Sequence, residues 1–404
     1  MAEWKPDGTR GLSRDAAAFW TRNGEAVPLD AVPGLSSDAF ADWCLDHCST
    51  GSRLAACLAL PSRDSGAGGA SEVLAVIADD AGSRLGLVRM ELPVSRSYAA
   101  LSSRLPQAQA FERELLELNG IHPLGHPWLK PLRRHADLES GIRSGGQPDS
   151  HPFFRVEGEG IHEIGVGPVH AGIIEPGHFR LQCYGEQVLH LEIQLGYQHR
   201  GAEALLLSSS PARRLVVAES LAGDSVLGHS LAHCGAIEAL ADAEVSLNAQ
   251  TVRGIALELE RIANHVGDLG ALCGDVGYLP GASWLGRLRG EFLNLLLELS
   301  GNRYGRGLVS PGGVRFGLSA AQRRDWLERL PGIERDLRDT ADLMFGNSSV
   351  GDRFEHTGAL ARETGEALGL VGPVARASGC DRDLRRDHPH GVFRFAHIPV
   401  ALAE

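Results

Sequence analysis

The sequence predicts an α+β protein: a small N-terminal α/β domain, then a β-hairpin region followed by a mainly α-helical bundle. Up to about residue 195, short branched or alternating apolar runs are separated by turn residues, which is typical of strands. After Gly201 the apolar residues recur with helical spacing instead. The expected helices are 202–208, 212–221, 226–242, 248–272, 284–301, 319–344 and 358–369.

Three helices are expected before that point. Asp15–Trp20 and Ser37–Cys48 have helical apolar spacing, and residues 111–118 have the pattern of an amphipathic helix. Asn119-Gly120 follows as a helix stop, because glycine readily takes the left-handed conformation that ends many helices.

Two β-hairpins are also expected. Glu72–Ile77 and Leu85–Leu92 are rich in branched apolar residues and are separated by a turn sequence. His178–Tyr184 and Gln187–Leu195 alternate in character around Gly185-Glu186, which predicts a hairpin with one buried face. Farther along, Val309–Val314 contains a Pro-Gly-Gly sequence and is expected to be a loop between two helices.

The chain of 404 residues is long enough for two domains. We expect a first domain over 1–135 and a second over 153–404. The stretch 136–152, polar and containing Gly, Ser and Pro, is the expected linker.

Composition excludes some classes of protein. The net charge of −12 disfavours a nucleic-acid binder, because duplex affinity depends on Lys and Arg that neutralise phosphates. The N-terminus has no basic start followed by an apolar run, so a secretory signal is not expected, and no apolar window is long enough for a membrane-spanning helix. The seven cysteines are scattered and odd in number, which favours reduced thiols. Cys44, His47 and Cys48 alone are a weak zinc signal without a second cysteine pair.

A Gly- and Pro-rich loop over 167–178 carries His170, Glu175 and His178. Such a loop brings the backbone close to a ligand, and histidine exchanges protons near neutral pH. Glu175, beside Pro176, is a candidate proton relay. The alternative, favoured on the residues alone, is that these side chains only form hydrogen bonds with the loop backbone.

A second candidate group lies near the start of the helix expected at 226–242. Asp224 is a candidate helix cap, because acids favour a helix N-terminus. His229 and His233 are four residues apart and share a helix face, but no third ligand accompanies them, so packing is the favoured interpretation over metal binding.

Two further groups are charged. Glu258, Arg261 and His265 fall on one side of a long helix; surface ion pairing is the favoured interpretation, and a chain of ionisable groups through the core is the alternative. His199 and Arg200 end the second hairpin, where they are able to bind a carboxylate or face a redox centre of a partner. No glycine-rich phosphate loop opens a helix after a strand, so a nucleotide site is not supported.

The stretch Glu219–Ser230 resembles the motif that presents two cysteines to nickel in the large subunit of [NiFe] hydrogenases. Glu219, Gly223, His229 and Ser230 stay in register with that motif, but Ala222 and Ser225 occupy the two cysteine positions. A methyl group cannot bind nickel, and a hydroxyl is a hard ligand where a soft thiolate is needed. The resemblance therefore implies the scaffold of a metalloenzyme without its metal site.

Other segments extend the resemblance over about 155–404. In order, these are Gly167–His170, Leu195–Glu203, Glu258–His265, Pro311–Val314, Gly372–Gly379 and Asp383–Pro389. Together they are similar to the 49-kDa-type (D-type) component of respiratory complex I and to the large subunit of membrane-bound group 4 [NiFe] hydrogenases. Residues 111–121 and 125–129 resemble the 30-kDa-type (C-type) component, and this fused order is similar to the large subunit of formate hydrogenlyase-type complexes.

The resemblance implies a peripheral electron-transfer subunit on the cytoplasmic face of the cell membrane, with integral membrane subunits as partners. An iron–sulfur small subunit would place a [4Fe–4S] cluster beside His199 and Arg200. His170, Glu175, Asp224 and His229 would act in electron or proton handling. His178, Gly223 and Ser225 would line a cavity that takes a quinone-like molecule, no cofactor or metal would be held directly, and NAD would be used only by other subunits.

Three departures from the family pattern limit these expectations. Complex I homologues have a quinone-binding Tyr where this chain has Gly223, and the second, quinone-facing His of the loop has no clear counterpart. Glu175 instead follows the hydrogenase type. Family members continue beyond the position matched by Glu404, so the second domain is expected to be incomplete at its C-terminal side. The alternative to a catalytic subunit is a structural subunit that keeps the fold as an assembly platform.

Overall fold

A computed structural model describes residues 17–61, 70–133, 154–170, 175–396 and 400–401 of the chain. These residues belong to two compact units. Unit 1 falls within Met1–Arg22, Val27–Arg200 and Arg362–Arg382, and unit 2 within Asn23–Ala26, Gly201–Ala361 and Asp383–Glu404. Strands and helices are both extensive, so the protein has the predicted α+β fold. The boundaries 1–135, 136–152 and 153–404 stay predictions, and most of 136–152 lies outside the described residues.

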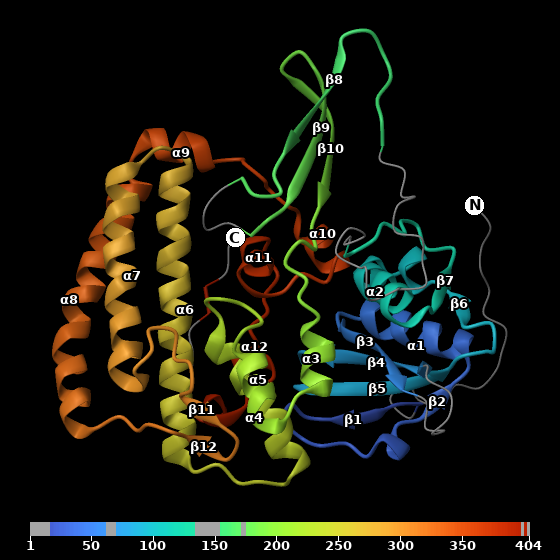
Figure 1. The fold of residues 1–404 in the computed structure, drawn as a ribbon, viewed down its shortest axis with the longest axis horizontal. Helices are drawn as coiled ribbons and strands as arrows, with labels where there is room; N and C mark the ends of the chain where they lie inside the picture. Colours follow the sequence, from blue (N-terminus) through green and yellow to red (C-terminus); the bar gives the residue numbers. More distant parts are fainter. Residues whose placement is uncertain (1–16, 62–69, 134–153, 171–174, 397–399, 402–404) are drawn as a thin grey trace. The chain divides into compact units, whose positions relative to one another are not determined.

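The first part of unit 1 is an α/β layer (Figure 1). Its sheet has the order β1-β5-β4-β3, with β2 parallel to β5. The strands are β1 (Phe19–Thr21), β2 (Gly34–Leu35), β3 (Arg53–Pro61), β4 (Ala70–Asp79) and β5 (Arg84–Glu91). Alternate residues of β4 and β5, such as Val73, Ile77 and Met90, are fully buried, because they face α1 (Ser37–Ser49) and α2 (Gln109–Asn119) in one apolar core.

Most of the elements predicted for this layer are confirmed. The hairpin of 72–77 and 85–92 is β4 and β5, and α2 ends where Gly120 adopts φ +61°. The helix expected at 15–20 is wrong: Phe19–Thr21 forms β1, whose Trp20 pairs with Gly86 of β5. Bulky aromatic and β-branched residues suit a pleated edge better than a helix, and Gly86 leaves room for the Trp20 ring, which a Cβ there would meet at 2.9 Å.

A smaller sheet follows in unit 1, with the order β10-β9-β8. It consists of β8 (Ile161–Val166), β9 (His178–Tyr184) and β10 (Gln187–Gln194), so the second predicted hairpin is confirmed. The prediction that this hairpin buries one face is not confirmed for β10, because Leu191 and Ile193 are 47% and 43% exposed. Two short strands, β6 (Ser97–Ala99) and β7 (His122–Leu124), pair in parallel, and α10 (Arg362–Ala367) and α11 (Gly372–Ala377) complete the unit.

Unit 2 is mainly helical (Figure 1). After α3 (Ala202–Ser208) and α4 (Pro211–Ala218), the long helices are α5 (Val226–Leu240), α6 (Leu247–Asp275), α7 (Leu279–Ser300) and α8 (Ala320–Phe345). They bury one apolar core that includes Leu259, Val266, Leu288, Leu295 and Trp326. Among the described helices, none combines the length and the apolar character that crossing a lipid bilayer requires.

Two of the shorter elements, one in unit 2 and one in the 362–382 segment of unit 1, differ from expectation. Residues 309–314 form a small ladder, β11 (Val309–Ser310) with β12 (Gly313–Val314), where a plain loop is expected. The helix expected at 358–369 is reduced to α10, because Gly358 and Gly369 have φ of +67° and +70°, which end regular helix. A short helix, α9 (Ser348–Phe354), precedes α10, and the side chain of Asn347 caps its N-terminus. The short helix α12 (Leu384–Asp387) and the 3₁₀ turn η7 (Gly391–Arg394) follow later in the chain.

Candidate functional site

The turn between α4 and α5 carries the hydrogenase-like sequence and lies in unit 2. Glu219, at the end of α4, is 5% exposed and accepts a hydrogen bond from the Gly307 amide at 2.8 Å. This carboxyl therefore ties the start of the turn to the loop after α7. Gly223 and Asp224 are exposed, and Ser225 is partly buried.

The start of α5 is bound by a carboxylate from another helix. Glu260 of α6 accepts hydrogen bonds from the amides of Leu227 at 2.6 Å and Gly228 at 3.0 Å. These are two of the amides that a helix N-terminus leaves without a partner inside the helix. The expectation that Asp224 caps α5 is wrong: the N-cap residue is Ser225, whose side chain makes no capping bond, and Glu260 fills that role.

Glu260 is a functional candidate that the sequence analysis does not predict, because the spacing of its neighbours Glu258 and Arg261 indicates only an ion pair. Burial raises the pKa of Glu260 to about 7, while its two amide hydrogen bonds act in the opposite direction. A signal for it was available: Glu260 stands four residues after Ala256 and three before Ala263, both buried, so it lies on the core-facing side of α6.

Glu258 and Arg261 form the expected ion pair, at 3.3 Å. Glu258 also binds Arg385 at 2.9 Å, and Arg385 in turn binds Asp383 at 2.7 Å. The set is partly buried, and it joins α6 to α12 within unit 2. Its role is therefore tertiary packing as well as the surface pairing that the spacing suggests.

A second buried pair supports the same helices. Arg253 of α6 binds Glu238 of α5 through two nitrogens, at 3.0 and 2.6 Å. Arg253 also donates to the Gly313 carbonyl, and Glu238 accepts from the Gly312 amide at 2.7 Å. The Pro-Gly-Gly hairpin is thus fixed to α5 and α6 by charge-assisted hydrogen bonds.

His229 and His233 lie on α5 as expected. His233 has a buried Nε2 atom without a hydrogen-bond partner, and burial, with a smaller effect of Arg214, lowers its pKa. Among the described residues, no group of three or more His, Cys, Asp or Glu side chains is placed to hold a metal ion.

The loop over 167–178 lies in unit 1 between β8 and β9. Gly167 has φ +91°, and a Cβ there would lie 2.2 Å from the Gly177 carbonyl oxygen, so only glycine fits. The Gly177 amide donates to the Pro168 carbonyl and closes the loop, whose residues 171–174 lie outside the described residues.

The predicted side chains of this loop are placed as follows. His170 is exposed and meets the Phe179 ring edge-on at 5.5 Å between centroids. Glu175 is exposed. His178 is partly buried, with a buried Nδ1 that has no hydrogen-bond partner. His199 and Arg200 are exposed just after β10.

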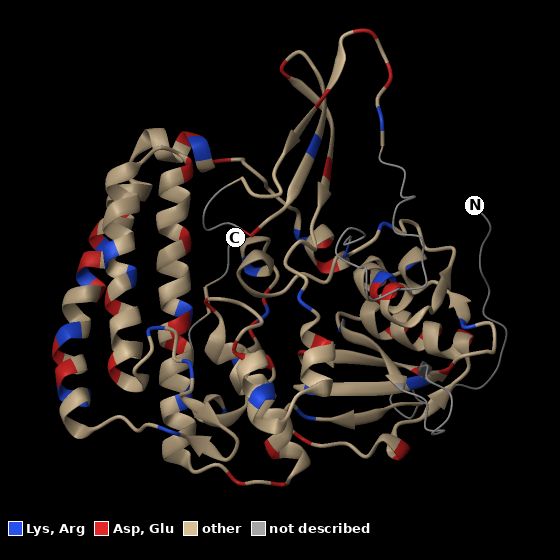
Figure 2. Ribbon diagram, viewed as in Figure 1, with Lys and Arg blue, Asp and Glu red and all other residues tan. Residues whose placement is uncertain are grey.

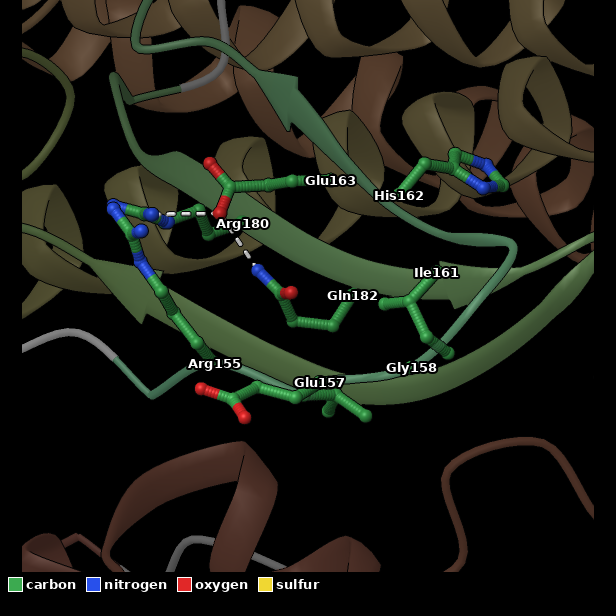
Figure 3. Close-up of a pocket in the computed structure, with 9 residues that line it drawn as sticks. Arg155, Glu157, Gly158, Ile161, His162, Glu163, Arg180 and Gln182 are labelled. Carbon is green, nitrogen blue, oxygen red and sulfur yellow. Dashed lines mark hydrogen bonds and ion pairs between the residues drawn. The ribbon is translucent and has the colours of Figure 1, made fainter.

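Unit 1 also contains an open hollow of about 510 Å³ on the β8–β9 surface (Figure 3). Glu163 accepts hydrogen bonds there from Arg180 at 2.6 Å and Gln182 at 2.7 Å. The hydrogen bond from Arg180 is the main cause of the lowered pKa of Glu163. His170, Glu175 and His178 are not among the lining residues, so the hollow is separate from the predicted loop site.

The predicted site residues divide between the two units. His170, Glu175, His178, His199 and Arg200 belong to unit 1. Gly223, Asp224, Ser225 and His229 belong to unit 2, and the structure brings these together at the start of α5. That the two groups line one cavity stays a prediction.

Comparison with known proteins gives one family match. Residues 275–404 match the model described as "Respiratory-chain NADH dehydrogenase, 49 Kd subunit".

Three relatives illustrate the similarity. Formate hydrogenlyase subunit 5 of Escherichia coli is 29% identical over 75% of this chain and 56% of its own length. Carbon monoxide-induced hydrogenase of Rhodospirillum rubrum is 30% identical over 60% of this chain and 68% of its own length. The C/D subunit of NADH-quinone oxidoreductase from Phocaeicola vulgatus is 27% identical over 71% of this chain and 60% of its own length. The chain thus spans less than two thirds of the first and third of these relatives.

Proposed function

Because the chain belongs to the family that unites the 49-kDa subunit of respiratory-chain NADH dehydrogenase with hydrogenase large subunits, we propose that it is a subunit of a membrane-associated, energy-converting oxidoreductase complex. In this role it lines a cavity that either binds a quinone-like molecule or is the remnant of an active site. It couples electron transfer to proton movement, without [NiFe] chemistry. The observation that carries the proposal is the turn before α5, which keeps the motif around Glu219 and His229 but has Ala222 and Ser225 at the thiolate positions.

The residues of this turn do not fit a nickel–iron centre. Soft thiolates bind nickel in such a site, whereas Ala222 has no donor atom and Ser225 offers only a hydroxyl. We therefore expect elemental analysis of the purified chain to find no stoichiometric nickel. About one nickel per chain, retained after treatment with a chelator, would overturn this part of the proposal.

The proposed partners follow from the family. An iron–sulfur small subunit would carry a [4Fe–4S] cluster facing His199 and Arg200, and integral membrane subunits would hold this peripheral subunit at the cytoplasmic face of the cell membrane. The exposure of His199 and Arg200 at the end of β10 supports such a contact. NAD would be used only by other subunits.

A quinone photolabel tests the cavity on the assembled complex. Labelling at His170 or near Asp224 that excess quinone prevents would support the proposal, and labelling confined to other subunits would contradict it. Turnover of the complex with Glu175→Gln tests the proton role. We expect it to fall, with Glu186→Gln in the exposed hairpin turn as a control that keeps normal turnover. Unchanged turnover in Glu175→Gln would remove Glu175 from the mechanism.

A second candidate function is that of a non-catalytic assembly subunit. The missing thiolates favour it, and so does the use of Glu219 and Glu238 in packing, since these carboxylates bind backbone amides of neighbouring loops. Under this alternative, His170→Ala and Asp224→Ala would leave turnover of the complex unchanged, while deletion of the chain would prevent the complex from assembling.

A further inference from the structure

We propose that Glu260 is a proton-operated clamp on the turn 222–225: its carboxylate holds the first turn of α5, and binding of one proton loosens that hold. The inference goes beyond the proposed function, which assigns no role to Glu260. It rests on that function only for the use that the complex makes of the proton.

The geometry defines the clamp. One carboxylate oxygen of Glu260 accepts from the Leu227 amide at 2.6 Å and the other from the Gly228 amide at 3.0 Å. These amides come two and three residues after Ser225, whose own side chain caps nothing. Glu260 is 6% exposed, so water does not replace these contacts easily. The position of the turn therefore depends on both oxygens being acceptors.

The charges around Glu260 come from three elements. Asp224, in the turn before α5, raises its pKa, and Arg261 of α6 lowers it. Arg289 of α7 lies 4.0 Å from Asp224 and partly neutralises that carboxylate. Burial outweighs the other influences and brings the pKa to about 7. The carboxyl thus changes its charge within the physiological range of pH.

The chemistry is a single proton transfer without redox change. The carboxylate takes one proton from solvent, and one of its oxygens becomes a hydroxyl. That oxygen now carries hydrogen and is a poorer acceptor, so one of the two amides, Leu227 or Gly228, loses most of its hydrogen bond. Release of the proton restores both bonds and fixes the turn again.

Amide hydrogen exchange of the full chain, followed by mass spectrometry at residue resolution, tests the proposal. After correction for the intrinsic pH dependence of exchange, we expect protection at Leu227 and Gly228 to fall several-fold as the pH drops through about 7. Glu260→Gln should remove this step. Glu258→Gln, two residues away on the same helix, is the matched control and should keep it. A protection factor that does not change with pH in the native chain would overturn the proposal.

An infrared titration of the native chain decides the matter even if Glu260→Gln does not fold. A protonated buried carboxyl gives a C=O band separate from those of carboxylates, and we expect one such band to disappear with a midpoint near pH 7. A spectrum in which every carboxyl titrates near the ordinary value for glutamic acid would refute the clamp. Neither measurement involves electron transfer or quinone. A negative result here therefore leaves the proposed function standing, and failure of quinone labelling leaves the clamp standing.

Discussion

Single buried carboxylates affect the stability of this chain, and the contribution of Glu260 depends on pH. Its pKa is about 7 in the folded chain and near 4.5 when unfolded, so the folded state binds the proton more tightly. The resulting stabilisation is complete below pH 4.5 and is lost as the pH rises to about 7. A raised pKa of this size corresponds to about 3 kcal/mol.

We therefore expect the free energy of unfolding, measured by urea titration, to decrease between pH 4.5 and 7 in the native chain. In Glu260→Gln this part of the decrease should be absent, because glutamine does not titrate. Equal pH dependence in the two proteins would show that Glu260 titrates normally.

The pair of Arg253 and Glu238 should behave differently, as a buried ion pair whose loss leaves a charge without its partner. Glu238→Ala is expected to lower the free energy of unfolding by about 3–5 kcal/mol. The matched control is Glu334→Ala, which breaks the exposed pair with Arg338 on α8 and should change the free energy of unfolding little. Chemical denaturation of both variants makes the comparison, and similar losses would contradict the assignment of the first pair as buried and coupled.

At the scale of elements, the loop over 167–178 depends on glycine. Gly167→Ala would place a methyl group 2.2 Å from the Gly177 carbonyl oxygen, in addition to the strain of a positive φ. Gly185→Ala, in the hairpin turn, meets only the strain, because nothing lies within 4 Å of its Cβ position. We expect the first variant to lose at least about 2 kcal/mol and the second about 1 kcal/mol, as thermal unfolding would measure. Equal losses would mean that the loop accommodates the added methyl group at residue 167 without an additional loss of unfolding free energy.

Elements with strong local signals were predictable from the sequence. The β4–β5 and β9–β10 hairpins, the end of α2 at Gly120 and the long helices of unit 2 follow from period and turn chemistry. The failures have physical causes. At Phe19–Thr21, pairing with β5 overrides a helical apolar pattern, and α9 is too short to show a period. The role of Glu260 depends on a partner 32 to 33 residues away, which no local pattern encodes.

The long helices of unit 2 carry charged residues of both signs (Figure 2). Side chains of both signs run along α8, where Arg329 binds Glu298 and Asp325 and where Arg338 binds Glu334. The pairs Asp325–Arg329 and Glu334–Arg338 are four residues apart, the spacing at which side chains meet on one helix face. Such exposed pairs add little stability, so the apolar core that includes Leu288 and Trp326 dominates the packing of this bundle.

At the scale of the whole molecule, the central question is whether the two groups of predicted site residues meet. If they line one cavity, His170→Cys combined with Asp224→Cys should be joined by a short bis-maleimide, after replacement of the partly exposed Cys48. The single variants His170→Cys and Asp224→Cys are the controls, and neither should form an internal cross-link. If the pair is not cross-linked in the assembled complex, the two groups of residues do not line one cavity.

The anchoring of the turn before α5 also bears on how such chains diverge. Its backbone is held by carboxylates from outside, Glu219 through Gly307 and Glu260 through Leu227 and Gly228. None of these contacts uses the side chains at 222, 223 or 225. Residues 222, 223 and 225 can therefore change without loss of these anchors, so the chemistry of the turn is separable from the stability of its backbone.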